Sequence, residues 1–394
     1  MDAHALTQHA LTAVPLHGLA TGRGLPNEHY IDNGLFAEER HGLFFAQWAG
    51  LAFGKDVPQP GDARPVDFLG VPLLLLRDRD GEIRVFQNTC RHRGMLLVTE
   101  PTRIRGAIRC PYHSWCYGMD GSLRSTPNVG GPGQNGHPAL NPSDLGLIPI
   151  RSHVWRDIVF VNLNGTAPAF EEAHAPLLQR WQEFEQPLHF GGPGSSFELE
   201  VQCNWKLAVE NYCESYHLPW VHPELNSYSR LEDHYNIEGE GGFAGQGSLV
   251  YRQLQDEDGA VLPDFAELGE RWNEAAEYIA LYPNVLLGVQ RDHAFAVLLE
   301  PRSCERTSEQ IVLYYAQDPA TTPELDALRA ENARRWRRVF EEDIFVVEGM
   351  QKGRHGPHFD GGRFSPVMDG PTQHFHQWVA RQFAAPPGAL RAAT

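Results

Sequence analysis

The alternation of apolar and polar residues divides this 394-residue chain into two parts. Between about residues 66 and 163, short apolar runs alternate with turn residues, which is typical of a small all-β domain. Val71–Leu76 and Ile83–Phe86 flank the turn residues Asp78–Gly81 and predict a β-hairpin. Ser125–Asn141 is rich in glycine, proline and asparagine, so we expect an exposed loop there.

The second part predicts helices and strands together. Phe197–Val201 alternates strictly, as a half-buried strand does, and Asn204–His217 has the pattern of a helix. A long helix is expected from Thr322 and Pro323 to about Lys352, with a hydroxyl cap followed by proline. Further strands are predicted at Ser248–Leu254, Asn284–Val289, Ala294–Leu299 and Gln310–Ala316. The expected fold class is α+β, with the all-β domain inserted in or preceding an antiparallel-sheet domain.

Composition and charge narrow the function. The net charge of −17 disfavours nonspecific binding to nucleic acid or to an anionic membrane. No apolar run reaches the roughly eighteen residues that a spanning helix needs, and Met1–Gly22 lacks the basic start and apolar centre of a signal peptide. Six cysteines without a disulfide framework are typical of a reducing compartment, so we expect a cytoplasmic protein.

Two cysteine–histidine pairs are the strongest chemical signal. Cys90 and His92 enclose one residue, Cys110 and His113 enclose two, and seventeen residues separate the pairs. A Rieske [2Fe–2S] centre uses two thiolates on one iron and two imidazoles on the other. Gly94 after the first pair permits the tight turn that a loop over a cluster needs.

Zinc is the alternative ligand, since it also accepts two cysteines and two histidines. Zinc fingers keep like ligands together, whereas each loop here donates one of each kind. The spacing therefore favours the iron–sulfur cluster.

A second metal motif lies near the predicted helix 204–217. Glu214, His217 and His222 follow one another there, and Glu214 and His217 would share a helix face. Pro219 disfavours helical geometry at Leu218, so the chain can kink and bring the two histidines together. Two imidazoles and one carboxylate form the facial triad of non-haem Fe(II) oxygenases.

The helical phase of the predicted long helix suggests which residue supplies the carboxylate of this triad. Asp343 lies at the centre of the apolar stripe of the long helix, whereas its neighbours Glu341, Glu342 and Glu348 point away from that stripe. A carboxylate on an apolar face is costly unless a positive group meets it. Iron is one such group, and a buried arginine of another subunit, from the runs at 334–335 or 337–338, is the alternative.

These motifs together resemble the α subunit of the Rieske non-haem iron oxygenases. The resemblance rests on CRHRG, CPYHSW, NWK, the segment from Glu210 to His222, and the acidic segment around Asp343. It implies a helix-grip catalytic domain and divides the chain into an N-terminal segment at 1–44, a Rieske domain at 45–165 and a catalytic domain at 166–394.

The resemblance also implies an electron path. In that family the subunits form a trimer, and an acidic residue connects a cluster histidine of one subunit to an iron-ligating histidine of the next. By position this residue is Glu214, between His113 and His217. The family usually has an aspartate one residue later, so the longer glutamate here is a departure.

That departure is similar to the oxygenases of quaternary ammonium compounds: the carnitine and glycine betaine monooxygenases and stachydrine demethylases, which are homotrimers. Such substrates are bound by aromatic faces. Tyr212 matches the family's cage tyrosine, and Trp220, Tyr282 and Phe295 are further candidates, although core packing is the alternative for each.

The expected function is hydroxylation or demethylation of a betaine- or carnitine-like substrate with O2. The alternatives are an aromatic-ring hydroxylating oxygenase and, in another class, a Rieske electron-transfer protein. The sequence contains no G-x-G-x-x-G after a strand and no plant-type ferredoxin motif, so it predicts a separate flavin- and iron–sulfur-containing reductase that uses NAD(P)H.

Overall fold

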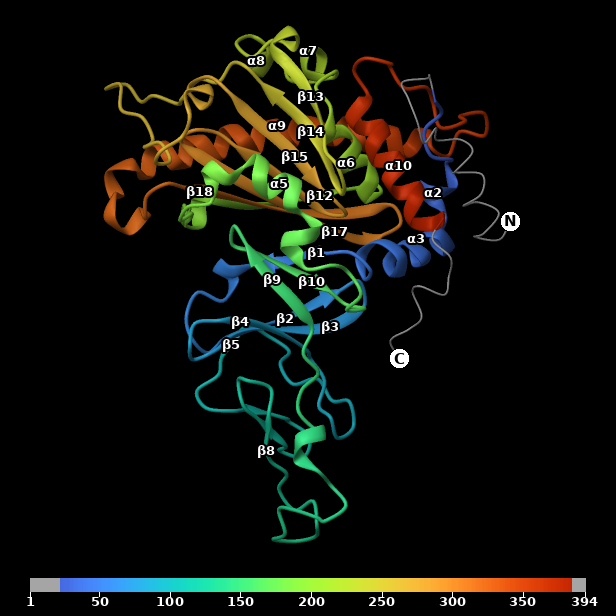
Figure 1. Cartoon of the computed structure of the whole chain (residues 1–394), viewed down its shortest axis with the longest axis vertical. Coiled ribbons are helices and arrows are strands. Elements are labelled where there is room, and N and C mark those ends of the chain that lie inside the picture. The colour runs from blue at the N-terminus through green and yellow to red at the C-terminus, as the bar shows by residue number, and fades with distance from the viewer. Residues whose placement is uncertain (1–21, 385–394) are drawn as a thin grey trace. The chain divides into compact units, whose positions relative to one another are not determined.

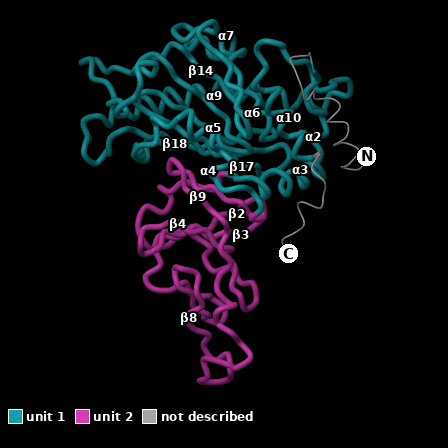
Figure 2. The backbone as a smooth tube through the Cα atoms, in the orientation of Figure 1, with its two compact units in different colours: residues 1–49, 166–394 teal, residues 50–165 magenta. Residues whose placement is uncertain are grey.

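The computed structural model describes residues 22–384, so the first 21 residues of the predicted N-terminal segment lie outside it. Residues 50–165 form one compact unit, and the chain before and after them forms the other (Figure 2). The α+β prediction with an inserted all-β domain is confirmed (Figure 1). Among the described helices, none has the length and apolarity needed to cross a membrane.

The inserted unit is built from short antiparallel strands around two 3-10 turns, η2 (Gly54–Asp56) and η3 (Pro142–Asp144). Its sheets have the strand orders β1-β10-β9, β4-β3-β2-β5 and β6-β7-β8. The strands are β1 (Ala49–Phe53), β2 (Asp62–Phe68), β3 (Val71–Arg77), β4 (Ile83–Gln87), β5 (Thr102–Arg103), β6 (Ile108–Arg109), β7 (Cys116–Tyr117), β8 (Leu123–Ser125), β9 (Arg151–Trp155) and β10 (Ile158–Asn162).

Turn chemistry explains this unit. The predicted hairpin is present as β3 and β4, and Asp78 closes its turn by accepting hydrogen bonds from two backbone N–H groups. The predicted loop at Ser125–Asn141 forms no helix and, beyond its first residue, no strand. In the β9–β10 hairpin, Arg156 and Asp157 have φ of 53° and 63°, the left-handed pair that two-residue hairpin turns require.

The larger unit has an eight-stranded antiparallel sheet with the order β11-β18-β17-β16-β15-β14-β13, and β12 also pairs with β18. The strands are β11 (His189–Phe190), β12 (Ser196–Val201), β13 (His234–Glu238), β14 (Phe243–Ser248), β15 (Ala276–Leu281), β16 (Val285–Val289), β17 (His293–Ser303) and β18 (Arg306–Tyr315).

Helices pack against this sheet, and α6, α9 and α10 contact its strands directly. The α-helices are α2 (Glu28–Ile31), α3 (Asn33–Glu39), α4 (Phe170–Ala173), α5 (Ala175–Arg180), α6 (Trp205–Cys213), α7 (Leu218–Val221), α8 (Pro223–Asn226), α9 (Asp326–Gly353) and α10 (Gly370–Ala384). The part of this unit that the structure describes also has one π turn, η1 (Arg40–Phe44), and six 3-10 turns: η4 (Gln182–Phe184), η5 (Pro193–Ser195), η6 (Leu231–Asp233), η7 (Glu270–Asn273), η8 (Pro319–Thr321) and η9 (Pro323–Leu325).

Four of the five predicted strands of this unit are present, but the one at Ser248–Leu254 is wrong. The chain enters β14 earlier, at Phe243, and leaves it at Ser248. Two glycines made β14 a poor strand by propensity. A Cβ at Gly245 would meet the backbone of β15 at Tyr278, and one at Gly247 would meet the Tyr235 ring, so close packing requires glycine at both positions.

Both predicted helices exist with shifted ends. The Asn204 side chain caps α6 by accepting the Lys206 N–H at 3.1 Å, but this helix ends at Cys213 instead of continuing to residue 217. The long helix α9 begins at Asp326. The predicted cap at Thr322 is wrong, because its hydroxyl donates to the Asp318 carbonyl at 3.1 Å.

A buried ion pair fixes the start of α6. The Lys206 ammonium lies 2.5 Å from Glu39 of α3, and both side chains are fully buried. Trp205 Nε1 donates to the same carboxylate at 3.0 Å. Burial by itself would raise the pKa of Glu39, but Lys206 and His29 outweigh burial and hold that pKa below its usual value. The carboxylate is therefore charged and needs its partner.

We expect Lys206→Ala to lower the free energy of unfolding by about 3–5 kcal/mol, because it leaves a buried carboxylate without its cation. Denaturant unfolding followed by tryptophan fluorescence measures this, with the exposed Lys352→Ala as the matched control. Since the folded-state pKa of Glu39 is the lower one, the pair stabilises the protein above the unfolded-state pKa and loses this effect as the pH falls through the folded-state value. An equal loss in both variants would contradict the prediction.

Candidate functional site

The two predicted cysteine–histidine loops have the same backbone geometry. The N–H of Cys90 donates to the Met95 carbonyl, and that of Cys110 donates to the Trp115 carbonyl, each at 2.8 Å. The residue four positions after each cysteine is left-handed, with φ of 71° at Gly94 and 58° at Ser114. The expected turn at Gly94 is therefore present, and its counterpart is a serine.

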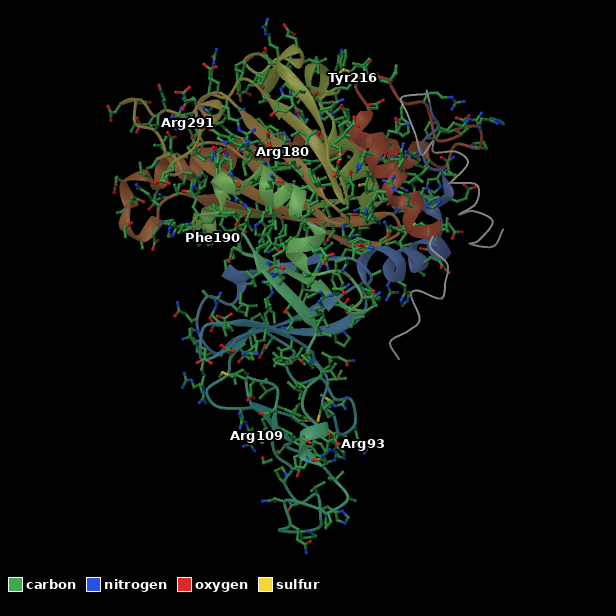
Figure 3. All side chains as sticks on the ribbon, in the orientation of Figure 1. Arg93, Arg109, Arg180, Phe190, Tyr216 and Arg291 are labelled. Atoms are coloured by element: carbon green, nitrogen blue, oxygen red, sulfur yellow. The ribbon has the colours of Figure 1, made fainter. Side chains whose placement is uncertain are left out.

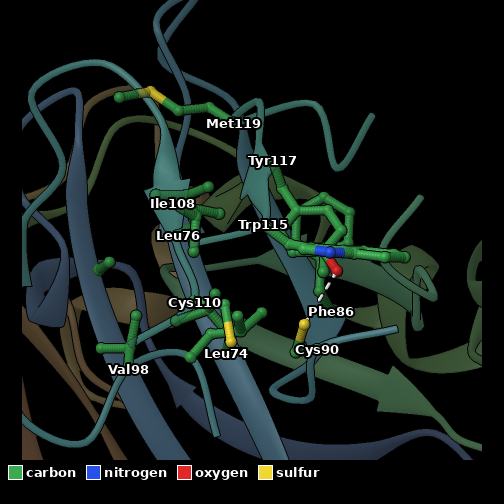
Figure 4. Close-up of a cluster of buried hydrophobic side chains, with 13 residues drawn as sticks. Leu74, Leu76, Phe86, Cys90, Val98, Ile108, Cys110, Trp115, Tyr117 and Met119 are labelled. Carbon is green, nitrogen blue, oxygen red and sulfur yellow. Dashed lines mark hydrogen bonds between the residues drawn. The ribbon is translucent and has the colours of Figure 1, made fainter. Parts of the chain in front are cut away.

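The cysteines and histidines of these loops differ in their exposure to solvent. Cys90 and Cys110 are buried within the hydrophobic core of this unit (Figure 4), whereas His92 and His113 are exposed. The two imidazole rings lie 4.7 Å apart, and the His92 ring stacks on Trp115. Partial desolvation of its ring lowers the pKa of His92, and the nearby His113 lowers that pKa further. The lower pKa favours the neutral imidazole that a Rieske iron binds.

Tyr117 adds a hydrogen bond to one cysteine. Its hydroxyl accepts the Arg91 N–H at 3.0 Å and lies 3.2 Å from Cys90 Sγ, as the dashed line in Figure 4 shows. Because the N–H occupies the acceptor side, the hydroxyl hydrogen is free to point at sulfur. Hydrogen bonds to cluster sulfurs stabilise the reduced state and raise the potential.

The second site lies where the chain breaks between α6 and α7. Glu214 is extended, so the prediction that it shares a helix face with His217 is wrong. The two side chains nevertheless meet, because the Glu214 carboxylate accepts the backbone N–H groups of Tyr216 and His217. Leu218 is helical, against prediction, because Pro219 lies in the first turn of α7, where proline is tolerated.

Three predicted side chains converge there. Nε2 of His222 lies 3.1 Å and Nε2 of His217 lies 3.7 Å from Asp343 Oδ1 on α9. One ligand atom from each of the three residues lies within 4.8 Å of the others. Two histidines and one aspartate at this spacing are able to hold a metal ion and leave further coordination positions open.

A carboxylate orients each imidazole from its other nitrogen. His217 Nδ1 lies 2.7 Å from Glu214 Oε1, and His222 Nδ1 lies 2.8 Å from Glu342 Oε2. This arrangement directs both Nε2 atoms toward Asp343, and carboxylates that contact the other ring nitrogen orient metal-bound histidines in the same way. The prediction that Glu342 points away is wrong. The Glu342 side chain extends around the helix to His222. The helical phase of α9 could not predict this contact, because it contains no information on the position of His222.

The site fits a cation. Asp343 Oδ1 is buried and accepts no well-formed hydrogen bond. Burial by itself would lower the pKa of His222, but Asp343 and Glu342 outweigh it and raise that pKa above its usual value. The arginines considered as partners for Asp343 pair with other carboxylates of the same chain: Arg334 and Arg335 with Glu331, Arg337 with Glu341, and Arg338 with Glu224.

These residues line a cavity of about 530 Å³, open solvent included, which we call the inner cavity. Tyr212, predicted as a substrate contact, is in its wall and donates its hydroxyl to the Leu287 carbonyl at 2.8 Å. Three further aromatic side chains, none of them predicted, complete the apolar wall: Tyr278, Trp336 and Phe340. Trp336 and Phe340 belonged to the apolar stripe of α9, so helical phase was the available signal.

The other aromatic candidates do not line the inner cavity. Trp220 is 70% exposed and packs edge-on against the exposed Tyr216, which Figure 3 labels at the surface of this unit. Tyr282 packs against Phe375 and Trp378 in the core. Phe295 is buried behind Trp336, with ring centroids 4.4 Å apart. For Tyr282 and Phe295 the core-packing interpretation holds, whereas the exposed Trp220 neither lines the inner cavity nor packs in the core.

Comparison with known families finds a domain match around each of the two groups of residues. Residues 47–138 match the model of the Rieske [2Fe-2S] domain, and residues 192–385 match that of the catalytic domain of the ring hydroxylating alpha subunit. The chain belongs to the Rieske non-haem iron oxygenases. This oxygenase therefore uses a [2Fe–2S] cluster and a mononuclear iron, and neither zinc nor a simple electron carrier describes it.

Individual relatives of the oxygenase extend over most of its length. It is 26% identical to choline monooxygenase of Atriplex hortensis over 90% of this chain and 76% of that protein. It is 24% identical to the oxygenase subunit of Escherichia coli carnitine monooxygenase, over 91% and 93% of the two chains. An oxygenase subunit implies a separate reductase.

Two solved structures share the fold. A quaternary ammonium Rieske monooxygenase bound to L-carnitine matches with a TM-score of 0.74 and 21% identity, over 94% of this chain and 99% of that one. Naphthalene 1,2-dioxygenase from a Rhodococcus species matches with a TM-score of 0.74 and 18% identity, over 98% of each chain.

We expect Glu342→Gln to weaken metal binding at the histidine–aspartate site by about 10–100-fold, since it removes the carboxylate that orients His222. Titration of iron-depleted protein with Fe(II) measures this, and the visible spectrum of the cluster should not change. The neighbouring Glu341→Gln is the matched control, because that exposed side chain pairs with Arg337 instead. Unchanged affinity in Glu342→Gln would contradict the assigned role.

Proposed function

We propose that this chain is the terminal oxygenase that hydroxylates or demethylates a small quaternary ammonium or N-methylated compound. The observation that carries the proposal is the composition of the inner cavity. Four aromatic side chains wall it beside Glu214 and Asp343, and no lysine or arginine is among its described lining residues. Aromatic faces and carboxylates together attract a cation that has no N–H group to donate.

One aromatic wall is held in place by a chain of hydrogen bonds. Trp336 Nε1 donates to His293 Nε2 at 2.7 Å, and His293 Nδ1 lies 2.8 Å from Asp292. Because the indole N–H needs an acceptor, His293 carries its proton on Nδ1, toward Asp292. This arrangement fixes the indole face before substrate binds, which lowers the entropy cost of binding.

The ligand assignments are part of the proposal. We assign the cluster to Cys90, His92, Cys110 and His113, and the mononuclear iron to His217, His222 and Asp343. The bound iron supplies the activation of O2 with electrons from the reductase. The described residues contribute the orientation of the imidazoles and an aromatic cavity that limits access of water.

We further propose that the oxygenase is a homotrimer in which Glu214 passes electrons between subunits. Its carboxylate already contacts His217 Nδ1, which is one half of the link that the family resemblance implies. The other half is His113 of the neighbouring subunit, an exposed side chain in this chain. We propose residues 45–165 as the cluster domain and 166–394 as the catalytic domain, with the described part of the N-terminal segment, residues 22–44, packed on the latter.

The chemistry balances for an N-methyl group. Hydroxylation of its carbon consumes O2, two electrons and two protons, and produces water and a carbinolamine. The C–N bond of the carbinolamine then breaks, which releases formaldehyde, a proton and the amine that has lost one methyl group. The names of the relatives, which include carnitine and choline monooxygenases, support this class of substrate.

A substrate screen with the reconstituted oxygenase and a Rieske-oxygenase reductase tests the proposal. We expect trimethylammonium compounds to couple O2 consumption to product, and aromatic hydrocarbons and aromatic acids not to do so. The aromatic wall contributes about 0.5–2 kcal/mol for each cation–π contact. Coupling with aromatic compounds alone would show that the chain is a ring-hydroxylating oxygenase and overturn the proposal.

Glu214 also orients His217, so the assay supplies Fe(II) in excess to keep both metal centres loaded. Under this condition we expect Glu214→Gln to lower turnover by about 10–100-fold or more, because it removes the charged link to His217. Glu224→Gln is the matched control, since that side chain is exposed and pairs with Arg338. Single-turnover experiments with a pre-reduced cluster separate electron transfer from substrate binding. Full activity of Glu214→Gln would rule out the electron path.

A further inference from the structure

Two more cavities continue from the inner cavity. The middle cavity, of about 570 Å³, shares Tyr278 and Trp336 with the inner one. The outer cavity, of about 1000 Å³ including open solvent, in turn shares Tyr228, Arg252 and Arg335 with the middle one. The shared lining residues place the three cavities next to one another in a series from the histidine–aspartate site toward the surface, which we call the cavity path.

Charge changes sign along this path. The inner cavity has two carboxylates and no arginine or lysine in its described lining, whereas the middle cavity has Arg252 and Arg335 and no carboxylate. The described lining of the outer cavity adds Arg291, again without a carboxylate. In a chain of net charge −17, this cationic end is not a product of the overall composition.

The guanidinium groups at this end are poorly neutralised. Within the described chain Arg252 has no carboxylate partner and lies only against the Tyr228 ring, 6.0 Å from its centroid. Arg335 shares the single carboxylate of Glu331 with Arg334. Arg291, in contrast, forms a close double hydrogen bond with Asp264.

Tyr228 offers a further donor beside them. Its ring lines both the middle and the outer cavity, and among the described residues its hydroxyl has no hydrogen-bond partner. The other tyrosine that lines both of these cavities, Tyr251, donates its hydroxyl hydrogen to Asp292 Oδ1 at 2.7 Å. Two guanidinium groups and a free hydroxyl around one cavity form a site for a carboxylate.

We propose that Arg252 and Arg335, with the Tyr228 hydroxyl, bind a carboxylate of the substrate. This inference rests on the proposed function and narrows it: the substrate is zwitterionic, with the quaternary ammonium toward the inner cavity and the carboxylate toward the outer one. Because neither arginine lines the inner cavity, several bonds separate the two charges. A longer trimethylammonium acid therefore fits better than glycine betaine or choline.

The test compares γ-butyrobetaine with the primary alcohol made by reducing its carboxyl group, so that only the anionic end differs. For the wild-type holoenzyme we expect kcat/KM to be at least about tenfold higher for the acid, since hydrogen bonds between charged groups are the strong ones. In Arg252→Gln, the KM for the acid should rise about tenfold or more with kcat changed by less than about twofold, and the alcohol should be unaffected.

Arg334→Gln is the matched control, because Arg334 neighbours Arg335 and pairs with Glu331 but lines none of the three cavities. Calorimetry with γ-butyrobetaine reports the loss of binding without turnover. The cluster spectrum and the midpoint of thermal unfolding show that Arg252→Gln is folded, and Arg252→Lys should recover part of the affinity.

The outcomes separate this inference from the proposed function. Equal use of acid and alcohol by the wild type, or an unchanged preference in Arg252→Gln, overturns the carboxylate site while the oxygenase still acts on quaternary ammonium compounds. Oxidation of aromatic acids only, with a raised KM in Arg252→Gln, overturns the proposed function and supports the carboxylate site.

Discussion

The active site depends on one geometric constraint: Nε2 of two histidines must meet a carboxylate carried by a helix more than a hundred residues later. The break between α6 and α7 places the histidines, and α9 carries Asp343 to them. Each imidazole is fixed from behind by a glutamate, so the rings cannot rotate away without losing a hydrogen bond. The charge gathered there explains why a cation is needed.

The scaffold keeps this geometry by burying charge at both ends of α6. At its start, Lys206 meets Glu39. Near its end, Glu210 meets His376 at 3.0 Å and Arg354 at 3.5 Å. Although burial by itself would raise the pKa of Glu210, these two partners hold that pKa below its usual value. Buried pairs contribute little net stability compared with apolar packing, but they penalise any register in which the partners separate.

The charges that line the cavities bear on which substrate the oxygenase would bind. Aromatic faces and carboxylates near the histidines favour a cation, and arginines farther out favour an anion. Tyr278 and Trp336, the two aromatic residues that line both the inner and the middle cavity, belong to β15 and α9, so rigid elements form this part of the wall. Sites built on such elements hold their geometry better than sites on loops.

The sequence alone predicted the two cysteine–histidine loops, the α+β class and the convergence of His217, His222 and Asp343, because these depend on local spacing or on the phase of a single helix. Only the tertiary structure decided the position of Glu342, the aromatic wall and the arginine end of the cavity path. The need for glycine in β14 likewise became clear only from its packing against Tyr235 and Tyr278. In each case the deciding contact joins elements far apart in the chain, and periodicity carries no information about which distant elements pack together.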